Sequence, residues 1–182
     1  MRYSLMIIIA LLSFTVTPNA SAQVQQPTNT TAQAASTVDP NAPFMKDKHV
    51  PVFSITSIDG KEITNKQLPT KYKYTCIIIF SPDCSHCEHE AGELNKYADK
   101  FKDVLFIWDS YRDMDAIKKF ATKFNLVGQP NVIIGRDPAF TIPTFYRPKM
   151  TPFVALYDKG NLKKVWDQGV EAFELIKIIQ GN

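Results

Sequence analysis

Two cysteines three positions apart, Cys84 and Cys87, are the residues of this sequence whose spacing most directly suggests chemistry. They follow a short apolar run and open a segment with helical periodicity. The first cysteine then lies at the exposed start of a helix, where free backbone N–H groups and the helix dipole favour a thiolate. The second lies one turn deeper, placed to attack a mixed disulfide formed by the first. The pattern predicts a reversible Cys84–Cys87 disulfide with Cys84 as the attacking thiol.

Half of a zinc site is one alternative for such a pair. Zinc sites need further ligands, and no second Cys-x-x-Cys, His-x-x-x-His or Cys-x-x-His follows in the sequence. A chance pair in a plain core is the other alternative. The position between a strand and a helix, together with the export signal described below, favours redox use. We therefore expect neither a metal nor a dissociable cofactor.

Glu90 lies three residues beyond Cys87 and four before Leu94, so it faces inward on the same side of the helix. A carboxyl group on an apolar face tends to have a raised pKa, because burial disfavours its charge. Beside a thiol that must lose a proton, it is a candidate general base. The alternatives are a carboxylate that reaches solvent at the helix edge, or an i,i+4 pair with His86.

Ser85 and His86 stand between the two cysteines and are candidates for tuning the redox potential. A protonated His86 would stabilise a neighbouring thiolate and make the disulfide more oxidising. The alternative is an exposed helix residue without a role. His49 and His89 are interpreted as surface residues, and Cys76, in the middle of an apolar run, as a small buried hydrophobe.

The elements that must position these residues alternate between strands and helices. Apolar runs predict buried strands, spacings of three and four predict helices, and Asp-Gly or Asp-Lys-Gly-Asn turns predict hairpins. Ser110, with Asp113 three residues on, is a candidate cap for the second helix. The fold class is therefore α/β, a mixed sheet flanked by helices with an N-terminal β-hairpin. The expected strands are 52–58, 61–64, 74–80, 103–108, 131–134, 153–157 and 162–166; the helices have apolar faces at 87–101, 114–124 and 172–179 (Ala172, Phe173, Ile176 and Ile179).

From about Val50 to its end, the sequence resembles the thioredoxin fold, and within it the TlpA-like branch of exported thiol–disulfide oxidoreductases. That branch includes the cytochrome-c-maturation reductases. Three features carry the resemblance: a hairpin before the core strand, the run Cys84-Ser85-His86-Cys87-Glu88-His89-Glu90, which matches a Cys-x-x-Cys-x-x-Glu pattern, and Thr151-Pro152 before an apolar strand. The sequence departs from the family in having Asp83 where a tryptophan is common, and no proline between the cysteines.

The resemblance implies roles for Thr151 and Pro152. It places their peptide bond opposite the cysteine pair, in the cis form, which costs a residue before proline only ~0.5–1 kcal/mol. It also implies that both residues line the substrate groove, where the Thr151 backbone pairs with an extended peptide.

The first residues predict export rather than a place in the fold. Arg2 precedes an apolar run of about a dozen residues, and Ala20-Ser21-Ala22 supplies a cleavage site. A permanent anchor is the alternative, but the run is short for the ~20 residues of a spanning helix. We expect a signal peptide at 1–22, a flexible polar linker at 23–47, a domain at 48–182, a periplasmic or secreted location and no stable membrane span after cleavage.

Composition excludes several classes of function. The 182 residues are 45% hydrophobic and carry a formal net charge of +3, too little for a nucleic-acid binder. Three cysteines are too few for a disulfide scaffold. The main hypothesis is an enzyme that reduces disulfides in partner proteins and is recycled by an unidentified redox partner. The alternatives are a peroxiredoxin-like thiol peroxidase and a non-catalytic binding module.

Overall fold

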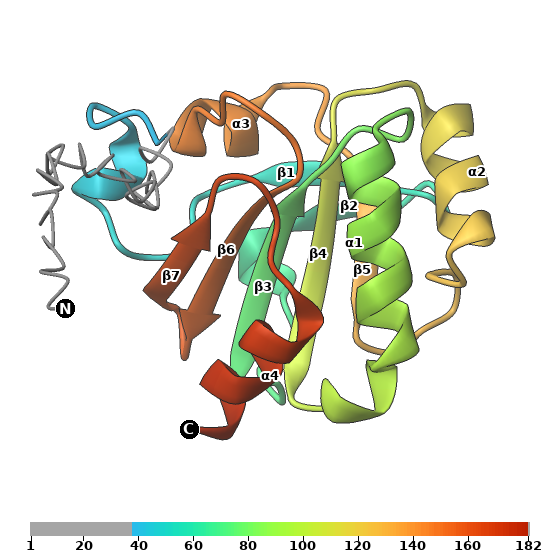
Figure 1. Ribbon diagram of the computed structural model, residues 1–182. Coiled ribbons are helices and arrows are strands. Elements are labelled where there is room, and N and C mark those ends of the chain that lie inside the picture. Colours follow the sequence, from blue (N-terminus) through green and yellow to red (C-terminus); the bar gives the residue numbers. More distant parts are fainter. Residues whose placement is uncertain (1–37, 182) are drawn as a thin grey trace, which may run out of the picture. The chain divides into compact units, whose positions relative to one another are not determined.

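The computed structural model describes residues 38–181 (Figure 1). The predicted signal peptide and most of the predicted linker lie outside these residues. The strands are β1 (Ser54–Ser57), β2 (Glu62–Thr64), β3 (Tyr74–Ile79), β4 (Val104–Ser110), β5 (Val132–Arg136), β6 (Phe153–Asp158) and β7 (Asn161–Trp166). The α-helices are α1 (Ser85–Lys96), α2 (Met114–Lys123), α3 (Thr141–Tyr146) and α4 (Ala172–Gln180). Short 3-10 helices are η1 (Pro43–Met45), η2 (Asn65–Gln67) and η3 (Ala98–Lys100).

The strands of this part of the chain form one mixed sheet in the order β2-β1-β5-β4-β3-β6-β7. The three central strands β5, β4 and β3 are parallel, whereas β6 and β7 follow in antiparallel pairing and β1 and β2 form the expected N-terminal hairpin. This arrangement confirms the predicted mixed α/β sheet with its hairpin extension. Because β3 lies inside the sheet, between β4 and β6, the residues that follow it emerge away from the two edge strands.

Two layers of core cover the two faces of the sheet. Helices α1, α2 and α4 pack on one face with the side chains of Cys76, Ile78 and their neighbours. The other face is covered by η1 and α3, over Ile77, Ile79 and their neighbours. Alternation along β3 therefore sends successive side chains into different cores, which explains why five of its six residues are apolar or aromatic and only Thr75 is polar.

The fold begins earlier in the chain than the predicted boundary at residue 48. Ala42 and Phe44, both within the predicted linker, are 1% and 2% exposed and belong to the core on the α3 face. The Phe44 ring packs against Tyr146 and Phe153. A polar segment without periodicity therefore docks through a single aromatic side chain, a contact that periodicity does not reveal.

The helices differ from the sequence-based expectations in three places. The cap of α2 is Asp113, whose side chain accepts hydrogen bonds from Asp115 N and Ala116 N, whereas Ser110 is the last residue of β4. The α-helix of the first helical segment ends at Lys96, and η3 continues it toward Phe101. Helix α3 was not predicted, since its six residues include a proline and are too few to show a period.

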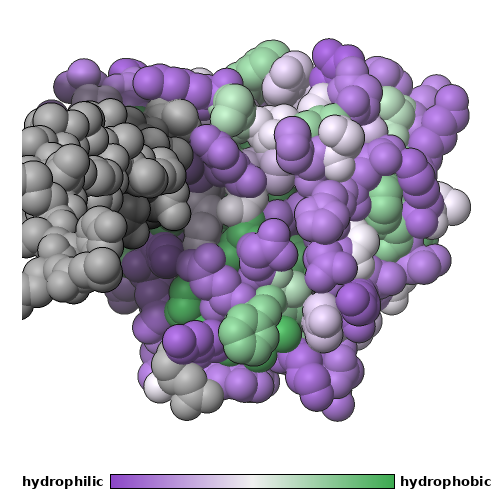
Figure 2. All heavy atoms as spheres, viewed as in Figure 1, coloured by the Kyte–Doolittle hydropathy of each residue, from purple (hydrophilic) through white to green (hydrophobic). Residues whose placement is uncertain are grey.

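Helix α4 packs three of its four expected residues, Ala172, Ile176 and Ile179, against the core, but not Phe173. Phe173 is 77% exposed, and Leu175 takes the buried position in its place. Figure 2 shows a mainly hydrophilic surface on this side of the molecule, with hydrophobic side chains grouped over the region of α4. The helix is apolar on more than one side, so its sequence did not decide which side packs on the sheet.

Candidate active site

Cys84 caps helix α1 and Cys87 lies in its first turn, after the short loop that follows β3. Cys84 is the N-cap, with extended backbone (φ −100°, ψ 119°), and it is half-buried. Cys87 is fully buried at 0% exposure. Cys84 N–H donates to Ser81 O at 3.1 Å, and Glu88 N–H donates to Cys84 O at 3.0 Å. The strand–loop–helix placement predicted from the sequence is thus confirmed, with both sulfurs present as free thiols.

The loop before Cys84 is held from several directions. Ser81 N–H donates to Cys87 Sγ at 3.5 Å, and its hydroxyl donates to Asp83. Asp83 also forms a salt bridge with Arg112 at 2.7 Å. The residue that replaces the family's common tryptophan therefore ties the cysteine loop to the segment between β4 and α2.

The two thiols have unlike acidities. Partial burial opposes ionisation of Cys84, but hydrogen bonds from Cys87, from the Thr151 side chain and from the His86 N–H outweigh it and lower the pKa of Cys84. Burial raises the pKa of Cys87 to about 12, against a smaller lowering by the Ser81 N–H. The outer sulfur is thus the better nucleophile near neutral pH, and the inner one holds its proton.

The segment before β6 lies beside the cysteines, as the resemblance implied. The Thr151–Pro152 bond is cis. Cys84 Sγ donates to Thr151 O at 3.4 Å. Antiparallel pairing of β6 with β3 matches Phe153 with Ile79, which brings this segment to the same sheet edge as the first cysteine. A group that approaches Cys84 therefore also meets the Thr151 backbone.

Glu90 points into the protein, as its spacing predicted. It is 5% exposed, Oε2 accepts a hydrogen bond from Val170 N–H at 2.9 Å, and Oε1 has no hydrogen-bond partner within residues 38–181. Burial, with a smaller contribution from the charge of Glu171, raises the pKa of Glu90 to about 8. The carboxyl is therefore a buried acid, and its partner is a backbone N–H rather than His86.

Gly169 fixes the position of that carboxyl. Its backbone is left-handed (φ +87°), and a Cβ there would lie 2.5 Å from Glu90 Oε2 and 3.0 Å from Pro152 Cγ. Only a residue without a side chain fits this gap. The loop between β7 and α4 thus packs against both Glu90 and Pro152, a link that the sequence analysis missed. The Asp-Gln-Gly-Val run was its only signal.

The remaining candidates have either exposed side chains or a buried packing role. The side chains of Ser85, His86 and His89 are exposed, and His86 acts on Cys84 through its backbone N–H. Cys76 is fully buried, and burial raises its pKa well above the ordinary value, which fits a packing role. Within residues 38–181, no three His, Cys, Asp or Glu side chains are grouped so that they could hold a metal ion.

Proteins of known structure with a similar fold exist. No family model and no curated protein matches the sequence. Solved structures do match, among them a thioredoxin-like protein from Aeropyrum pernix (TM-score 0.59, 17% identity, 72% of this chain and 89% of that chain). The chain has a thioredoxin fold.

Two other structures with this fold are relevant to chemistry. A secreted disulfide oxidoreductase from Mycobacterium tuberculosis, homologous to E. coli DsbE, is 20% identical (TM-score 0.59) over 71% of this chain and 96% of that chain. A peroxiredoxin-like protein from Aquifex aeolicus is 19% identical (TM-score 0.59) over 73% and 84%. At these identities the likeness concerns the fold, and the chemistry must be argued from the site itself.

One buried acid of the thioredoxin fold was not foreseen. Asp109, in β4, is 0% exposed, and neither carboxyl oxygen has a hydrogen-bond partner in the described part of the chain. Burial, and then the charge of Asp137, raise the pKa of Asp109 well above its ordinary value. Its side chain alternates with that of Trp108, so it lies on the α3 face of the sheet, away from Cys87. A buried carboxyl without a hydrogen-bond partner bears on the stability of the fold.

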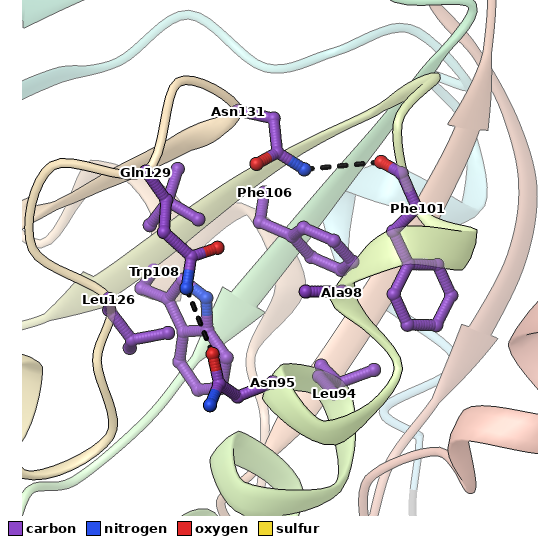
Figure 3. A pocket seen from close by; sticks show the side chains of 10 residues that line it. Leu94, Asn95, Ala98, Phe101, Phe106, Trp108, Leu126, Gln129 and Asn131 are labelled. Carbon is purple, nitrogen blue, oxygen red and sulfur yellow. Dashed lines mark hydrogen bonds between the residues drawn. The ribbon is translucent and has the colours of Figure 1, made fainter.

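A small cavity lies at the C-terminal end of α1 and belongs to the core. Figure 3 shows its lining side chains, with Gln129 Nε2 donating to Asn95 Oδ1 at 2.9 Å and Asn131 Nδ2 donating to Phe101 O at 3.1 Å. Its water-accessible volume is about 10 Å³, the room of a single water molecule. It is therefore a packing gap and no substrate site.

None of the helices in residues 38–181 is long and apolar enough to cross a membrane.

Proposed function

We propose that this protein is an exported thiol–disulfide oxidoreductase that reduces disulfides in partner proteins. The observation that carries the proposal is the pairing of two unlike thiols in one helical turn. Cys84 is accessible and has a lowered pKa, whereas Cys87 is buried with a pKa of about 12. A non-catalytic module has no need of such an arrangement, because it requires neither an activated sulfur nor a second one behind it.

The reaction proceeds in two exchanges. The Cys84 thiolate attacks one sulfur of a partner disulfide, forms a mixed disulfide and releases the partner's other sulfur as a thiolate. Cys87 then loses its proton and attacks Cys84 Sγ, which closes the Cys84–Cys87 disulfide and releases the partner's second thiolate. The partner gains two electrons, and its two thiolates take up the protons lost by the two cysteines. A separate dithiol donor must reduce the Cys84–Cys87 disulfide again.

Glu90 serves the second exchange in this proposal. Cys87 must lose a proton that burial makes it hold tightly. Glu90 is the buried carboxyl three residues along the same helix face, and the pKa of about 8 lets it exchange protons near neutral pH. Gly169 lies next to both Glu90 and Pro152, so the proton acceptor is a neighbour of the substrate groove expected at Thr151 and Pro152.

The direction of the net reaction rests on opposing features. The Cys-x-x-Cys-x-x-Glu pattern resembles a reductive branch, and we propose reduction on that ground. The hydrogen bonds that lower the pKa of Cys84 stabilise the dithiol form and so act toward oxidation. A potential nearer the value of thioredoxin (about −270 mV) than that of a strong periplasmic oxidant (about −120 mV) is expected on equilibration with glutathione. A potential at the oxidant end, with poor reduction of insulin disulfides, would reverse the direction.

Location in the periplasm or outside the cell is part of the proposal. It is supported by the signal-like run in the first 22 residues, and a match of similar fold is described as secreted. An oxidising compartment supplies the partner disulfides that the reaction needs.

Trapping of mixed disulfides tests the proposal directly. A Cys87→Ser protein lacks the resolving thiol, so partners should accumulate on Cys84 as adducts that a reductant releases. Cys76→Ser is the matched control, since it removes a buried thiol outside the pair and should not trap. Adducts that form only when Cys84 is removed would reverse the two roles.

Thiol peroxidase activity is the second candidate, because a peroxiredoxin-like protein shares the fold. Peroxidases need a lone reactive cysteine with a nearby arginine, whereas Arg112 is engaged here with Asp83. Peroxide consumption that outpaces disulfide reduction, and that survives Cys87→Ser, would favour the peroxidase. A binding module would retain partner binding with both cysteines changed to serine.

A further inference from the structure

A groove of about 300 Å³ adjoins the reactive cysteine on the α3 face of the sheet. Its lining includes Ile79 at the end of β3, Tyr111 after β4, Phe140 at the start of α3, and the segment that ends at Thr151. We call it the α3 groove. Thr151 connects it to the chemistry, because its carbonyl accepts from Cys84 Sγ at 3.4 Å. A chain segment that occupies the groove therefore lies within reach of the sulfur.

The α3 groove has a mixed lining, and three of its apolar side chains are open to solvent. Tyr111, Phe140 and Met150 are 39%, 48% and 48% exposed, and they account for three of the seven large hydrophobic side chains exposed in residues 38–181. The Tyr111 and Phe140 rings stack, with centroids 5.4 Å apart and planes at 26°. Exposed apolar side chains that gather around one hollow mark a place where another apolar group binds.

The fold holds the Phe140 ring in this exposed position at a cost to its backbone. Phe140 has left-handed backbone (φ 54°, ψ 32°), which a bulky residue rarely adopts. The turn is held by buried Asp137, whose carboxylate accepts from Ala139 N at 3.1 Å and from Ile142 N at 2.8 Å. These hydrogen bonds hold the turn in one conformation, so the Phe140 ring keeps a fixed position in the lining of the groove.

The rim of the α3 groove is positively charged. Arg147 and Lys149 line it, and none of its lining residues is a carboxylate. Arg147 forms a salt bridge with Asp39 at 3.4 Å, and the charge of Lys149 also helps to lower the pKa of that carboxyl, so two cations share one nearby carboxylate. Within residues 38–181, the Thr151 N–H donates to no other group. The groove thus offers a cluster of exposed apolar side chains, two cationic side chains and a backbone N–H donor near one sulfur.

We propose that the α3 groove recognises the partner segment next to the cysteine that Cys84 attacks: an extended segment with a bulky apolar side chain close to that cysteine and acidic residues beyond it. The inference rests on the proposed function and adds the substrate class to it. The apolar side chain packs against the stacked Tyr111 and Phe140 rings and Met150. The acidic residues face Lys149, and the segment's backbone pairs with Thr151.

Synthetic peptides measure this preference. Each carries one cysteine activated as a mixed disulfide with thionitrobenzoate, flanked by Leu or Ser and followed by Glu or Lys. Attack by Cys84 in a Cys87→Ser protein forms the Cys84–peptide disulfide and releases coloured thionitrobenzoate, which gives a second-order rate constant. The Leu–Glu peptide should react about tenfold or more faster than the Ser–Lys peptide, the range that one buried side chain contributes. Equal rates for all four peptides would overturn the proposal.

Variants locate the preference. Phe140→Asn removes the ring but keeps a residue that accepts left-handed backbone, and should bring the Leu-to-Ser rate ratio close to one. Lys149→Glu should invert the preference between Glu and Lys. Phe173→Asn is the matched control, an exposed phenylalanine on α4, and should leave both ratios unchanged. A preference that survives Phe140→Asn would show that another surface reads the peptide.

A further measurement distinguishes failure of the groove proposal from failure of the proposed redox function. Reaction of Cys84 with a small disulfide reports the thiol's own reactivity without the groove. If small disulfides react and the peptides show no preference, the groove proposal fails and the redox function stands. If neither small disulfides nor peptides react with Cys84, the proposed function itself fails.

Discussion

Replacing Glu90 with Gln should change how the stability of the dithiol protein depends on pH. The amide has nearly the same shape and retains an oxygen that accepts from Val170 N–H, so packing beside Gly169 is preserved. What it lacks is the charge that the buried carboxyl acquires at alkaline pH. Comparison of the two proteins therefore isolates the ionisation of one group.

The magnitude follows from the pKa of Glu90, raised from 4.5 to about 8 by burial. The folded protein holds this proton more tightly than the unfolded chain, so the stabilisation is complete below about pH 4.5 and is lost as pH rises through 8. One unit of pKa corresponds to about 1.4 kcal/mol, which gives a loss of about 5 kcal/mol, of which about 3 kcal/mol has occurred by neutral pH. Because Glu90 is only 5% exposed, solvent screening reduces this little.

Urea unfolding of the reduced proteins at a series of pH values between about 4 and 9 measures the effect. The free energy of unfolding of wild type, minus that of Glu90→Gln, should fall steadily across this range. Asp109 is present in both proteins, so its own titration cancels in the difference. Glu88→Gln, which removes a carboxylate from the surface of the same helix, controls for the loss of one negative charge.

Parallel pH profiles for wild type and Glu90→Gln would refute the reasoning. They would mean that the carboxyl ionises in the folded protein as easily as in the unfolded chain, through water or a movement of the loop that carries Gly169. In that case Glu90 could not serve as a proton acceptor poised near neutral pH, and its proposed role toward Cys87 would fall with it.

Three further predictions concern the site and its surroundings. Cys87 in a Cys84→Ser protein should react with iodoacetamide at neutral pH more than ~100-fold more slowly than Cys84 in Cys87→Ser, since its pKa is about 12; rates within tenfold would contradict this. Gly169→Ala should cost ~2 kcal/mol or more of unfolding free energy, and more than Gly128→Ala, which shares the left-handed backbone but has open space around it; equal costs would remove the argument from close packing. Asp109→Asn should stabilise the protein at alkaline pH by ~1–3 kcal/mol, because burial raises the pKa of that carboxyl and its charged form has no partner. Thermal unfolding measures the stability of both proteins at acid and alkaline pH. If Asp109→Asn is stabilised by the same amount at both, the charge of Asp109 is not the cause.

The sequence by itself determined the elements that carry the cysteines. A short, mostly apolar and β-branched run favours a strand buried on both faces, and β3 is such a strand. A spacing of three and four residues placed Cys87 and Glu90 on the inner face of α1, where both are buried. These features are local, because the periods of a strand and a helix are set by backbone geometry within a few residues.

Local rules also failed where two of them competed. Ser110 and Asp113 are both good N-caps, and the sheet decided between them by extending β4 through Ser110. Helix α4 has apolar residues on several sides, and packing on α1 and the sheet left Phe173 outside. In each case a long-range contact selected one of two locally acceptable outcomes.

Only the tertiary structure decided the acidities and the surroundings of the sulfurs. The pKa of a group depends on burial and on neighbours from distant parts of the chain, as Thr151 beside Cys84 and Val170 beside Glu90 show. Gly169 and Phe140 matter because of what lies next to them, and neither stands in a pattern with a period. Sequence periodicity reports which side of an element is inward; it contains no information on which residues meet there, because those contacts join segments many residues apart.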